Sequence, residues 1–279
     1  MELLRYVAFS DRVDGGNPAG VVLDASDLGP DRMLEIAAEV GYSETAFVTE
    51  RTDRTLSVRY FSPKVEVPFC GHATIATAVA FADAHGPGDL LMNTQAGPIK
   101  VTTSVNADGH TVATLVSVPP RVEEMSDALL ENLLSILGWS SSDLDPALPP
   151  RVANAGASHP IIAAATRERL ADLSYDFPAL AELMVQAGWT TIDLVWRERT
   201  DVFHARNPFP PGGVVEDPAT GAAAAAFGGY LRDLGLLALP ATVTLHQGHD
   251  MGRPSTITVS IPADTASGIA VTGTAVELA

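Results

Sequence analysis

Residues 70–84 read CGHATIATAVAFADA, and residues 219–231 read ATGAAAAAFGGYL. Both stretches are rich in alanine, the strongest helix former, and both begin beside glycine or proline punctuation. The pattern predicts helices over about 73–84 and 219–231. Because small side chains let neighbouring elements approach closely, each helix is expected to lie at the centre of a sheet that wraps around it.

The segments around these two helices follow each other in the same order in both halves of the chain. Each half has a turn leading into a strand, a short amphipathic helix, a strand pair, the alanine-rich helix and a closing strand. In the first half these parts fall at 15–23, 33–40, 45–61, 73–84 and 99–105. In the second half they fall at 156–163, 180–187, 191–205, 219–231 and 256–261. Five matching parts in order favour an internal duplication over chance alternation.

The duplication predicts two lobes, an N-terminal lobe over 1–118 and a C-terminal lobe over 119–279. A last strand near 269–279 is a candidate to join the first lobe instead. A linker is expected near 119–126 or near 146–150, where prolines gather. The active site is expected in a cleft between the lobes.

Composition excludes several classes of partner. The chain has 279 residues, 46% of them hydrophobic, and a net charge of −17 that repels nucleic acid and anionic lipid. No apolar run approaches the roughly 20 residues that cross a bilayer, and residues 1–10 do not resemble a signal peptide. A cytoplasmic location is therefore expected. Cys70 is the single cysteine, which excludes an internal disulfide and a cysteine-based zinc cage and fits a reducing compartment.

The starts of the two alanine-rich helices are candidate anion sites. A helix N-terminus presents unpaired N–H groups and a partial positive charge, so it binds carboxylate or phosphate without a lysine. Gly71 and Gly221 allow a ligand to approach the backbone closely. Lys64 and Lys100 are the only lysines, so an acidic chain needs such backbone donors. A small anionic molecule is the expected substrate.

One carboxylate stands out by comparing the two halves. Glu44 lies in Ser43-Glu44-Thr45-Ala46, whereas the stretch taken as its equivalent, 189–192, has no carboxylate. The acid is therefore expected in one lobe only. The same comparison places 70–72 opposite 216–218, so one site is predicted to gather Glu44, His72 and Asp217.

Other signals point to no further site. His246, His249 and Asp250 have metal-ligand side chains, but Gly248 indicates a loop, so solvated or structural roles are expected. No glycine-rich nucleotide-binding pattern occurs in the sequence. Arg253 either holds a substrate carboxylate or ties its loop to the lobe, and the sequence leaves both open.

Five motifs in order resemble the PhzF family, the phenazine-biosynthesis-type isomerases. They are Gly16-Asn17-Pro18-Ala19, 43–48 (SETAFV), 68–74 (PFCGHAT), 216–221 (EDPATG), and Gln247-Gly248 with Gly252-Arg253-Pro254-Ser255. The resemblance covers nearly the whole chain. It implies the α+β, diaminopimelate epimerase-like fold, with two pseudo-symmetric lobes that each wrap a barrel-like sheet around a central helix. It also implies a homodimer that needs no cofactor and no metal.

The resemblance also implies roles for individual residues. Glu44 matches the catalytic acid/base, and His72 and Asp217 match the polar residues that orient the substrate. The substrate-binding positions that follow from the motifs are Ser43, Cys70, Gly71, Ala73, Thr220, Gly221 and Ala222. Ala222 departs from the pattern, because many members have serine there.

The expected activity is a cofactor-independent proton shift on a small carboxylate, such as a trans-2,3-dihydro-3-hydroxyanthranilate-like molecule or another amino or hydroxy acid. Two alternatives stay open. One is an amino-acid epimerase or racemase that uses Cys70, in a thiol–carboxylate form because the second lobe has no cysteine. The other is a relative that binds a small molecule without turning it over.

Overall fold

The computed structural model describes residues 1–278 and divides into two compact units. Unit 1 comprises Met1–Val116 and the chain from Thr272 onward, and unit 2 comprises Ser117–Val271. Residue 279, part of the strand expected near 269–279, lies outside the described residues. No helix of the described chain is long and apolar enough to span a bilayer.

Unit 1 is a closed barrel in the part of the chain that the structure describes. Its strands are β1 (Leu4–Ala8), β2 (Asn17–Val22), β3 (Glu44–Thr52), β4 (Thr55–Phe61), β6 (Gly88–Thr94), β7 (Gly97–Val105), β8 (Thr111–Val116) and β17 (Ala270–Glu277), with a short β5 (Glu66–Val67) on β4. Each pairs with the next in that order, and β17 pairs with both β8 and β1, which closes the ring. The β2–β3 and β4–β6 pairs are parallel.

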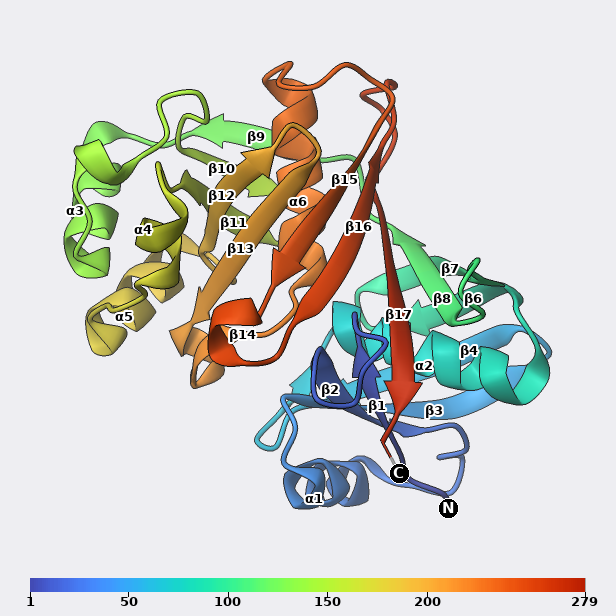
Figure 1. Cartoon of the computed structure of the whole chain (residues 1–279). Helices are drawn as coiled ribbons and strands as arrows, with labels where there is room; N and C mark the ends of the chain where they lie inside the picture. Colours follow the sequence, from blue (N-terminus) through green and yellow to red (C-terminus); the bar gives the residue numbers. More distant parts are fainter. Residues whose placement is uncertain (279) are drawn as a thin grey trace. The chain divides into compact units, whose positions relative to one another are not determined.

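Helix α2 (Gly71–His85) fills this barrel (Figure 1). All its residues from His72 to Ala82 are buried, which the alternation of alanine with larger apolar side chains makes possible on every face. The helix packs against strands β1, β2, β3, β7 and β8. The prediction of a central, alanine-rich helix within a sheet is confirmed for this unit.

Helix α1 (Pro30–Val40) packs on the outside of unit 1. Met33, Ile36 and Ala37 form its buried face and join Phe47 and Phe61 in a small core. Gly41 ends the helix in the left-handed conformation, with φ of 71°. Pro30 at the first position and Gly41 at the end are the punctuation that the sequence analysis used.

Unit 2 repeats this order of elements. Its sheet runs β9 (Arg121–Glu124), β10 (Arg151–Asn154), β11 (Ser158–Ala163), β12 (Asp193–Arg199), β13 (Val202–Phe209), β15 (Ala241–Gln247) and β16 (Ser255–Ile261), with β14 (Val214–Asp217) on β13. The β11–β12 and β13–β15 pairs are parallel, as are β2–β3 and β4–β6 in unit 1. Helix α6 (Gly221–Asp233) packs against β9, β10, β11 and β16.

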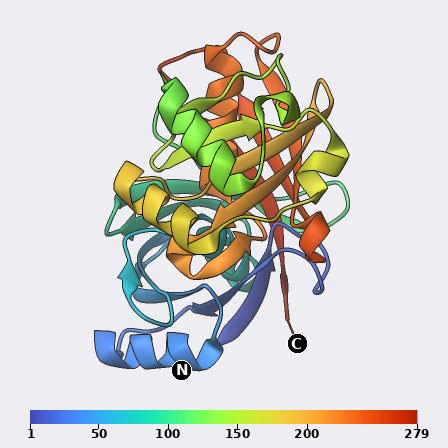
Figure 2. The same cartoon turned by 90° about the vertical axis from the view of Figure 1, so that its left-hand side faces the viewer.

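A helical layer covers the outer face of this sheet. Helices α3 (Asp127–Leu137), α4 (Arg167–Ala171) and α5 (Phe177–Ala187) lie there, with α3 and α5 side by side in Figure 2. They share a core that includes Leu133, Leu180, Met184 and Trp189. Short 3-10 turns complete the unit at Ser141–Asp143, Pro210–Gly212 and His249–Met251.

Several elements differ from the predictions. Residues 121–124, expected within a linker, form strand β9 and pair with β10. Helix α3 was not predicted, although Ser126 caps it by accepting a hydrogen bond from the Leu129 N–H. Strands β6, β8 and β15 were also missed, because they lie outside the five parts on which the two halves were matched. In the structure each of them pairs with a neighbouring strand on both edges.

Candidate active site

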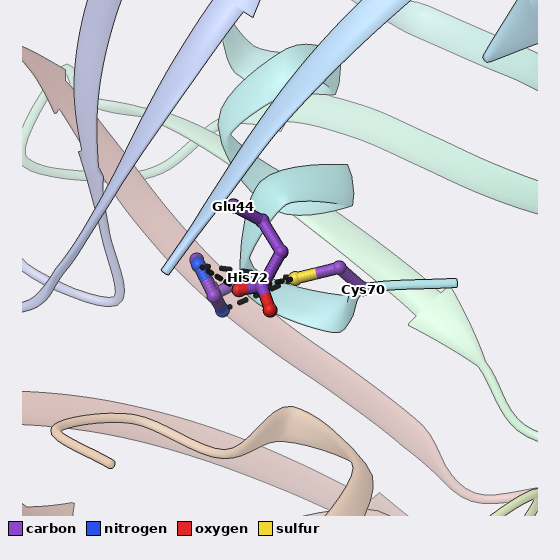
Figure 3. Close-up of side chains that lie close together, drawn as sticks. All are labelled: Glu44, Cys70 and His72. Carbon is purple, nitrogen blue, oxygen red and sulfur yellow. Dashed lines mark hydrogen bonds and ion pairs between the residues drawn. The ribbon is translucent and has the colours of Figure 1, made fainter. Parts of the chain in front are cut away.

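Three side chains that the sequence marked as site residues lie together in unit 1. The Cys70 thiol donates a hydrogen bond to Glu44 Oε2 over 3.4 Å, and His72 Nε2 lies 3.4 Å from the same oxygen. Cys70 Sγ is also 3.3 Å from His72 Nδ1. Figure 3 shows the three side chains converging from the start of β3 and the start of α2.

Local structure explains why these residues meet. Glu44 is the first residue of β3 and pairs with Ala19 of the parallel strand β2. Cys70 is the N-cap of α2, and His72 is the second residue of that helix. Because α2 runs inside the barrel, its first turn lies beside the end of the barrel at which β3 begins. The His72 side chain is 6% exposed and the Glu44 side chain 15%, so Glu44 is the more accessible of the two.

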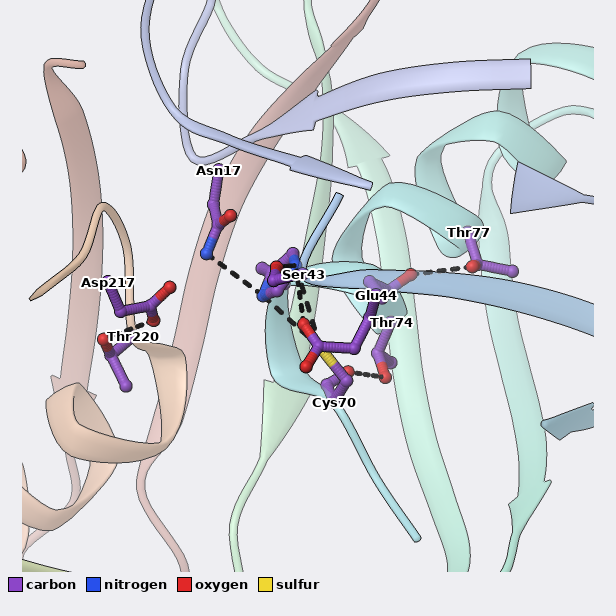
Figure 4. A network of polar contacts seen from close by, with 10 residues as sticks. Asn17, Ser43, Glu44, Cys70, Thr74, Thr77, Asp217 and Thr220 are labelled. Carbon is purple, nitrogen blue, oxygen red and sulfur yellow. Dashed lines mark hydrogen bonds and ion pairs between the residues drawn. The ribbon is translucent and has the colours of Figure 1, made fainter. Parts of the chain in front are cut away.

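The His72 ring is held on both nitrogens. Asn17 Nδ2 lies 3.2 Å from Nδ1, and Ser43 Oγ lies 3.3 Å from Nε2 (Figure 4). When Asn17 donates to Nδ1, the ring proton sits on Nε2 and faces Ser43 and Glu44. Asn17 was not predicted as a site residue, although it stands in the first motif. The signal in the sequence was its place in that motif, together with a side-chain amide that can bond an imidazole.

A buried hydrogen-bond chain fixes the first turn of α2 from behind. Thr74 Oγ1 donates to the Cys70 carbonyl over 2.7 Å, and Tyr60 OH lies 2.7 Å from the same Thr74 oxygen. Burial raises the pKa of Tyr60 well above its usual range, so the phenol stays protonated. This chain holds the Cys70 backbone rigidly where the helix begins.

Both central helices start without a side-chain cap in the described chain. The side chains of the N-cap residues Cys70 and Thr220 make no capping hydrogen bond to the first turns of their helices. The N-terminal amides of α2, which include those of Gly71 and Ala73, therefore remain the positive end of a helix dipole beside Glu44. The first turn of α6 contains Gly221 and Ala222 in the equivalent place.

The second set of predicted residues lies in unit 2. Thr220 Oγ1 donates to Asp217 Oδ2 over 2.6 Å, and the two side chains appear together in Figure 4. Gln247 fixes this loop: its Oε1 accepts from the Thr220 N–H over 3.0 Å, and its Nε2 donates to the Asp217 carbonyl over 2.7 Å. The sequence analysis named Gln247 only as part of a motif and did not predict that it holds this loop.

Two further features position the strand that carries Asp217. Glu216 forms a buried ion pair with Arg206 of β13, with a 2.9 Å bond from Nε to Oε2. Gly248, with φ of 74°, packs against the loop so closely that a Cβ would lie 2.7 Å from the Pro218 carbonyl oxygen. Only glycine fits both the backbone conformation and the space.

The expectation that only one lobe carries the acid is wrong. In the parallel pair of β2 and β3, Glu44 lies opposite Ala19, the residue after Pro18. In the parallel pair of β11 and β12, Asp193 lies opposite Ile161, the residue after Pro160. Glu44 and Asp193 are also the first residues of their strands. Asp193 is therefore the counterpart of Glu44. The sequence comparison missed it because the stretch taken as the equivalent, 189–192, ends one residue before Asp193. The second copy has two more residues than the first between the helix-ending glycine and the acid.

The two acids differ in burial. Asp193 is fully buried, and burial raises its pKa to about 7. Asn207 Nδ2 donates to Asp193 Oδ1 over 3.0 Å, Thr191 donates to Asn207, and His159 Nδ1 bonds to Thr191. Burial lowers the pKa of His159 to about 4. The second copy thus keeps its acid fully buried and hydrogen-bonded to Asn207, whereas the first copy leaves Glu44 partly exposed.

The histidines near residue 250 form a separate cluster. Gly248 precedes a 3-10 turn there, in agreement with the loop expected from the sequence. The ring centroids of His246 and His249 lie 5.3 Å apart. His204 lies 5.3 Å from His246 and bonds to Glu198 over 2.7 Å. Asp250 pairs with Arg167 over 2.7 Å.

Comparison with known proteins agrees with this architecture. Residues 6–279 match the family model described as phenazine biosynthesis-like protein. The uncharacterized isomerase YddE of Escherichia coli O157:H7 is 33% identical over 97% of this chain and 94% of its own length. The trans-2,3-dihydro-3-hydroxyanthranilate isomerase of Pseudomonas fluorescens is 32% identical over 86% of this chain and 83% of its own length.

Solved structures give the same result. The PhzF-family phenazine biosynthesis protein of Bacillus anthracis is 26% identical and superposes with a TM-score of 0.88 over 100% of this chain and 98% of its own. A probable proline racemase from Agrobacterium radiobacter K84 shares only the fold, with 12% identity and a TM-score of 0.66 over 98% and 90% of the two chains. The predicted diaminopimelate epimerase-like, α+β fold is confirmed. The chain belongs to the phenazine biosynthesis-like (PhzF) family of isomerases.

Proposed function

We propose that this isomerase shifts a proton on a small carboxylate substrate without a cofactor, with Glu44 as the acid/base. The observation that carries the proposal is the contact of Glu44 Oε2 with both His72 Nε2 and Cys70 Sγ, at 3.4 Å each, beside the uncapped start of α2. A partly exposed carboxylate beside buried polar groups can receive and return a proton.

In this mechanism the Glu44 carboxylate removes a proton from a carbon next to a carboxylate-bearing conjugated system. The electron pair moves into that system and gives an enolate-like intermediate. Glu44 then returns the proton to another carbon on the same face, so a double bond moves and nothing is oxidised or reduced. The first-turn amides of α2, including those of Gly71 and Ala73, stabilise the developing negative charge, an effect of about 3 kcal/mol for a well-placed donor.

Further residues orient the substrate in this proposal. Ser43 and Asn17 hold the His72 ring, which places its Nε2–H toward Glu44 and the substrate. For Asp217, Thr220, Gly221 and Ala222 the proposal keeps the substrate-binding roles that the resemblance to the family implies. The P. fluorescens relative supports a cyclic amino-carboxylate such as trans-2,3-dihydro-3-hydroxyanthranilate as a first substrate to assay. A homodimer in the cytoplasm, with no nucleic acid or membrane partner, completes the proposal.

The test is turnover in D₂O with trans-2,3-dihydro-3-hydroxyanthranilate and a panel of small amino and hydroxy carboxylates. The wild type should place deuterium on a carbon of the product, and E44Q should lower kcat by about 10²- to 10⁴-fold, since the acid/base is gone. The matched control is E50Q, because Glu50 lies in the same strand, is exposed and accepts a hydrogen bond from the Ser57 hydroxyl over 3.3 Å. Unchanged turnover in E44Q, or product without deuterium, would contradict the proposal.

A thiol-dependent epimerase is the second candidate, because the Cys70 thiol lies 3.3 Å from His72 Nδ1 and contacts Glu44. C70S separates the two reactions. An epimerase that uses Cys70 as a base should lose at least about 10²-fold in kcat, whereas isomerisation by Glu44 should fall by less than about 10-fold. A relative that only binds its ligand would show neither turnover nor deuterium exchange in the wild type.

A further inference from the structure

Glu44, Cys70 and His72 form the group within residues 1–278 whose three metal-ligand atoms lie within 4.8 Å of one another. We infer that this triad is a binding site for a thiophilic divalent cation of the zinc type, and that the bound cation inhibits the enzyme reversibly. The inhibitory part rests on the proposed role of Glu44 as acid/base. The metal site itself does not depend on that role.

The distances fit tetrahedral coordination. Zinc bonds to sulfur, nitrogen and oxygen at about 2.0 to 2.3 Å, which puts neighbouring ligand atoms of a tetrahedron roughly 3.3 to 3.6 Å apart. Here Cys70 Sγ and Glu44 Oε2 are 3.4 Å apart, and Glu44 Oε2 and His72 Nε2 are also 3.4 Å apart. The third pair, Cys70 Sγ and His72 Nε2, is 3.8 Å apart. Small side-chain adjustments bring all three atoms into the first coordination sphere.

The chemistry of the donors selects the cation. One thiolate, one imidazole and one carboxylate are ligands that zinc accepts, and the sulfur disfavours magnesium and calcium. Binding displaces the thiol proton of Cys70, so a thiolate and a carboxylate together neutralise a doubly charged cation. The net charge of −17 attracts cations to the protein in general. Three protein ligands leave a fourth position for water, which is the arrangement of an exchangeable zinc site.

The surroundings supply the outer contact that a histidine ligand needs. Metal-bound imidazoles donate their other ring N–H to an oxygen, which fixes the ring. His72 Nδ1 already faces the side-chain amide of Asn17 at 3.2 Å. Turning that amide presents its oxygen to Nδ1–H and frees Nε2 for the cation. A cation on Oε2 occupies the lone pair that would take the substrate proton, which is why it inhibits.

Cobalt and zinc test the site without an activity assay. One equivalent of Co²⁺ added to the whole wild-type protein should produce a thiolate-to-cobalt charge-transfer band in the near ultraviolet, and Zn²⁺ should remove the band by displacement. C70S should lose the band completely. H72N and E44Q should lower Zn²⁺ affinity by more than about 10-fold in competition with a chromophoric chelator. The control is H246N, which alters the separate cluster that contains His246 and His249 and should leave the band unchanged.

A second measurement needs no variant. Cys70 is the single cysteine, so alkylation by iodoacetamide reports on this site alone, and saturating Zn²⁺ should slow it at least about 10-fold because the thiolate is the reactive species. Absence of the cobalt band together with unprotected alkylation would overturn the inference, as would loss of binding in H246N but not in C70S. Full turnover by E44Q would instead contradict the proposed function and leave the metal site standing.

Discussion

Asp193 and Glu44 occupy the same place in two copies of one topology, yet their surroundings give them different properties. Asp193 is fully buried with its carboxyl raised in pKa to about 7, whereas the Glu44 side chain is 15% exposed and contacts a thiol and an imidazole. Because Glu44 is partly exposed, a small molecule can reach its carboxyl, whereas the buried carboxyl of Asp193 is closed off from solvent. The residue type alone does not make this distinction.

The raised pKa of Asp193 predicts a pH effect on stability. Its native pKa of about 7 exceeds the usual aspartate value of 3.8, so the folded state binds an extra proton between these values, and stability falls as pH rises through that window. The D193N variant has no carboxyl to titrate at this position, so it should not show this loss of stability at higher pH. We expect the stability of D193N relative to wild type to improve by about 4 kcal/mol between pH 4 and pH 8.

His159 provides an internal check on that experiment. Its pKa is lowered from 6.5 to about 4, so its contribution to stability is lost as pH falls through that range, opposite in sign to Asp193. Urea unfolding of D193N from pH 4 to 8 should therefore show stability rising up to about pH 6.5. D201N, at an exposed aspartate of the same unit, is the control. Parallel pH profiles for D193N and wild type would refute this account of Asp193.

At the scale of elements, the helix ends are built alike in the two copies. Gly41 ends α1 and Gly188 ends α5, with φ of 71° and 69°, and no atom of the described chain lies within 4 Å of a Cβ built on either. A side chain there meets no steric clash with neighbours, so the cost of replacing either glycine comes from the backbone conformation alone.

Gly41→Ala and Gly188→Ala should consequently destabilise the protein by nearly equal amounts, about 1 kcal/mol each, since alanine disfavours positive φ. Denaturant unfolding measures both. Gly29→Ala is the comparison variant, because Gly29 precedes α1 with φ of −78° and has nothing within 4 Å of a built Cβ. Equal effects at Gly29 and Gly41 would show that the left-handed conformation is not the cause.

At the scale of the whole chain, unit 1 depends on a strand from the far end of the sequence. Strand β17 pairs with β1 in the register Val7 to Val276, and Phe9 N–H bonds to the Thr274 carbonyl over 2.8 Å. On its other edge β17 pairs with β8, where Thr114 and Thr272 hydroxyls lie 2.7 Å apart. The last strand thus closes the barrel around α2.

A chain ended after Val271 should lose this closure. Strands β1 and β8 would then each lack a partner on one edge, so the hydrogen-exchange protection factors of their amides should fall at least about 10-fold. A chain ended after Leu278 keeps every described β17 pair and should exchange like the wild type. Unchanged protection of β1 and β8 in the shorter chain would show that the barrel closes without β17.

Local sequence preference was enough to predict the two central helices and the amphipathic helix that precedes each of them. Alanine-rich composition marked α2 and α6, and proline and glycine punctuation marked the ends of α1 and α5, because these residues act through local backbone preference. The motifs also indicated Glu44, Cys70 and His72, and the contacts between these three side chains are present in unit 1.

Tertiary structure alone decided the rest, because its causes lie between residues far apart in the chain. Strand register, not spacing from a glycine, identified Asp193 as the counterpart of Glu44. Pairing on both edges places strands β6, β8 and β15, which lie outside the parts shared by the two halves, in the sheets. Burial, which depends on what packs above a side chain, left Glu44 accessible and closed Asp193 off from solvent.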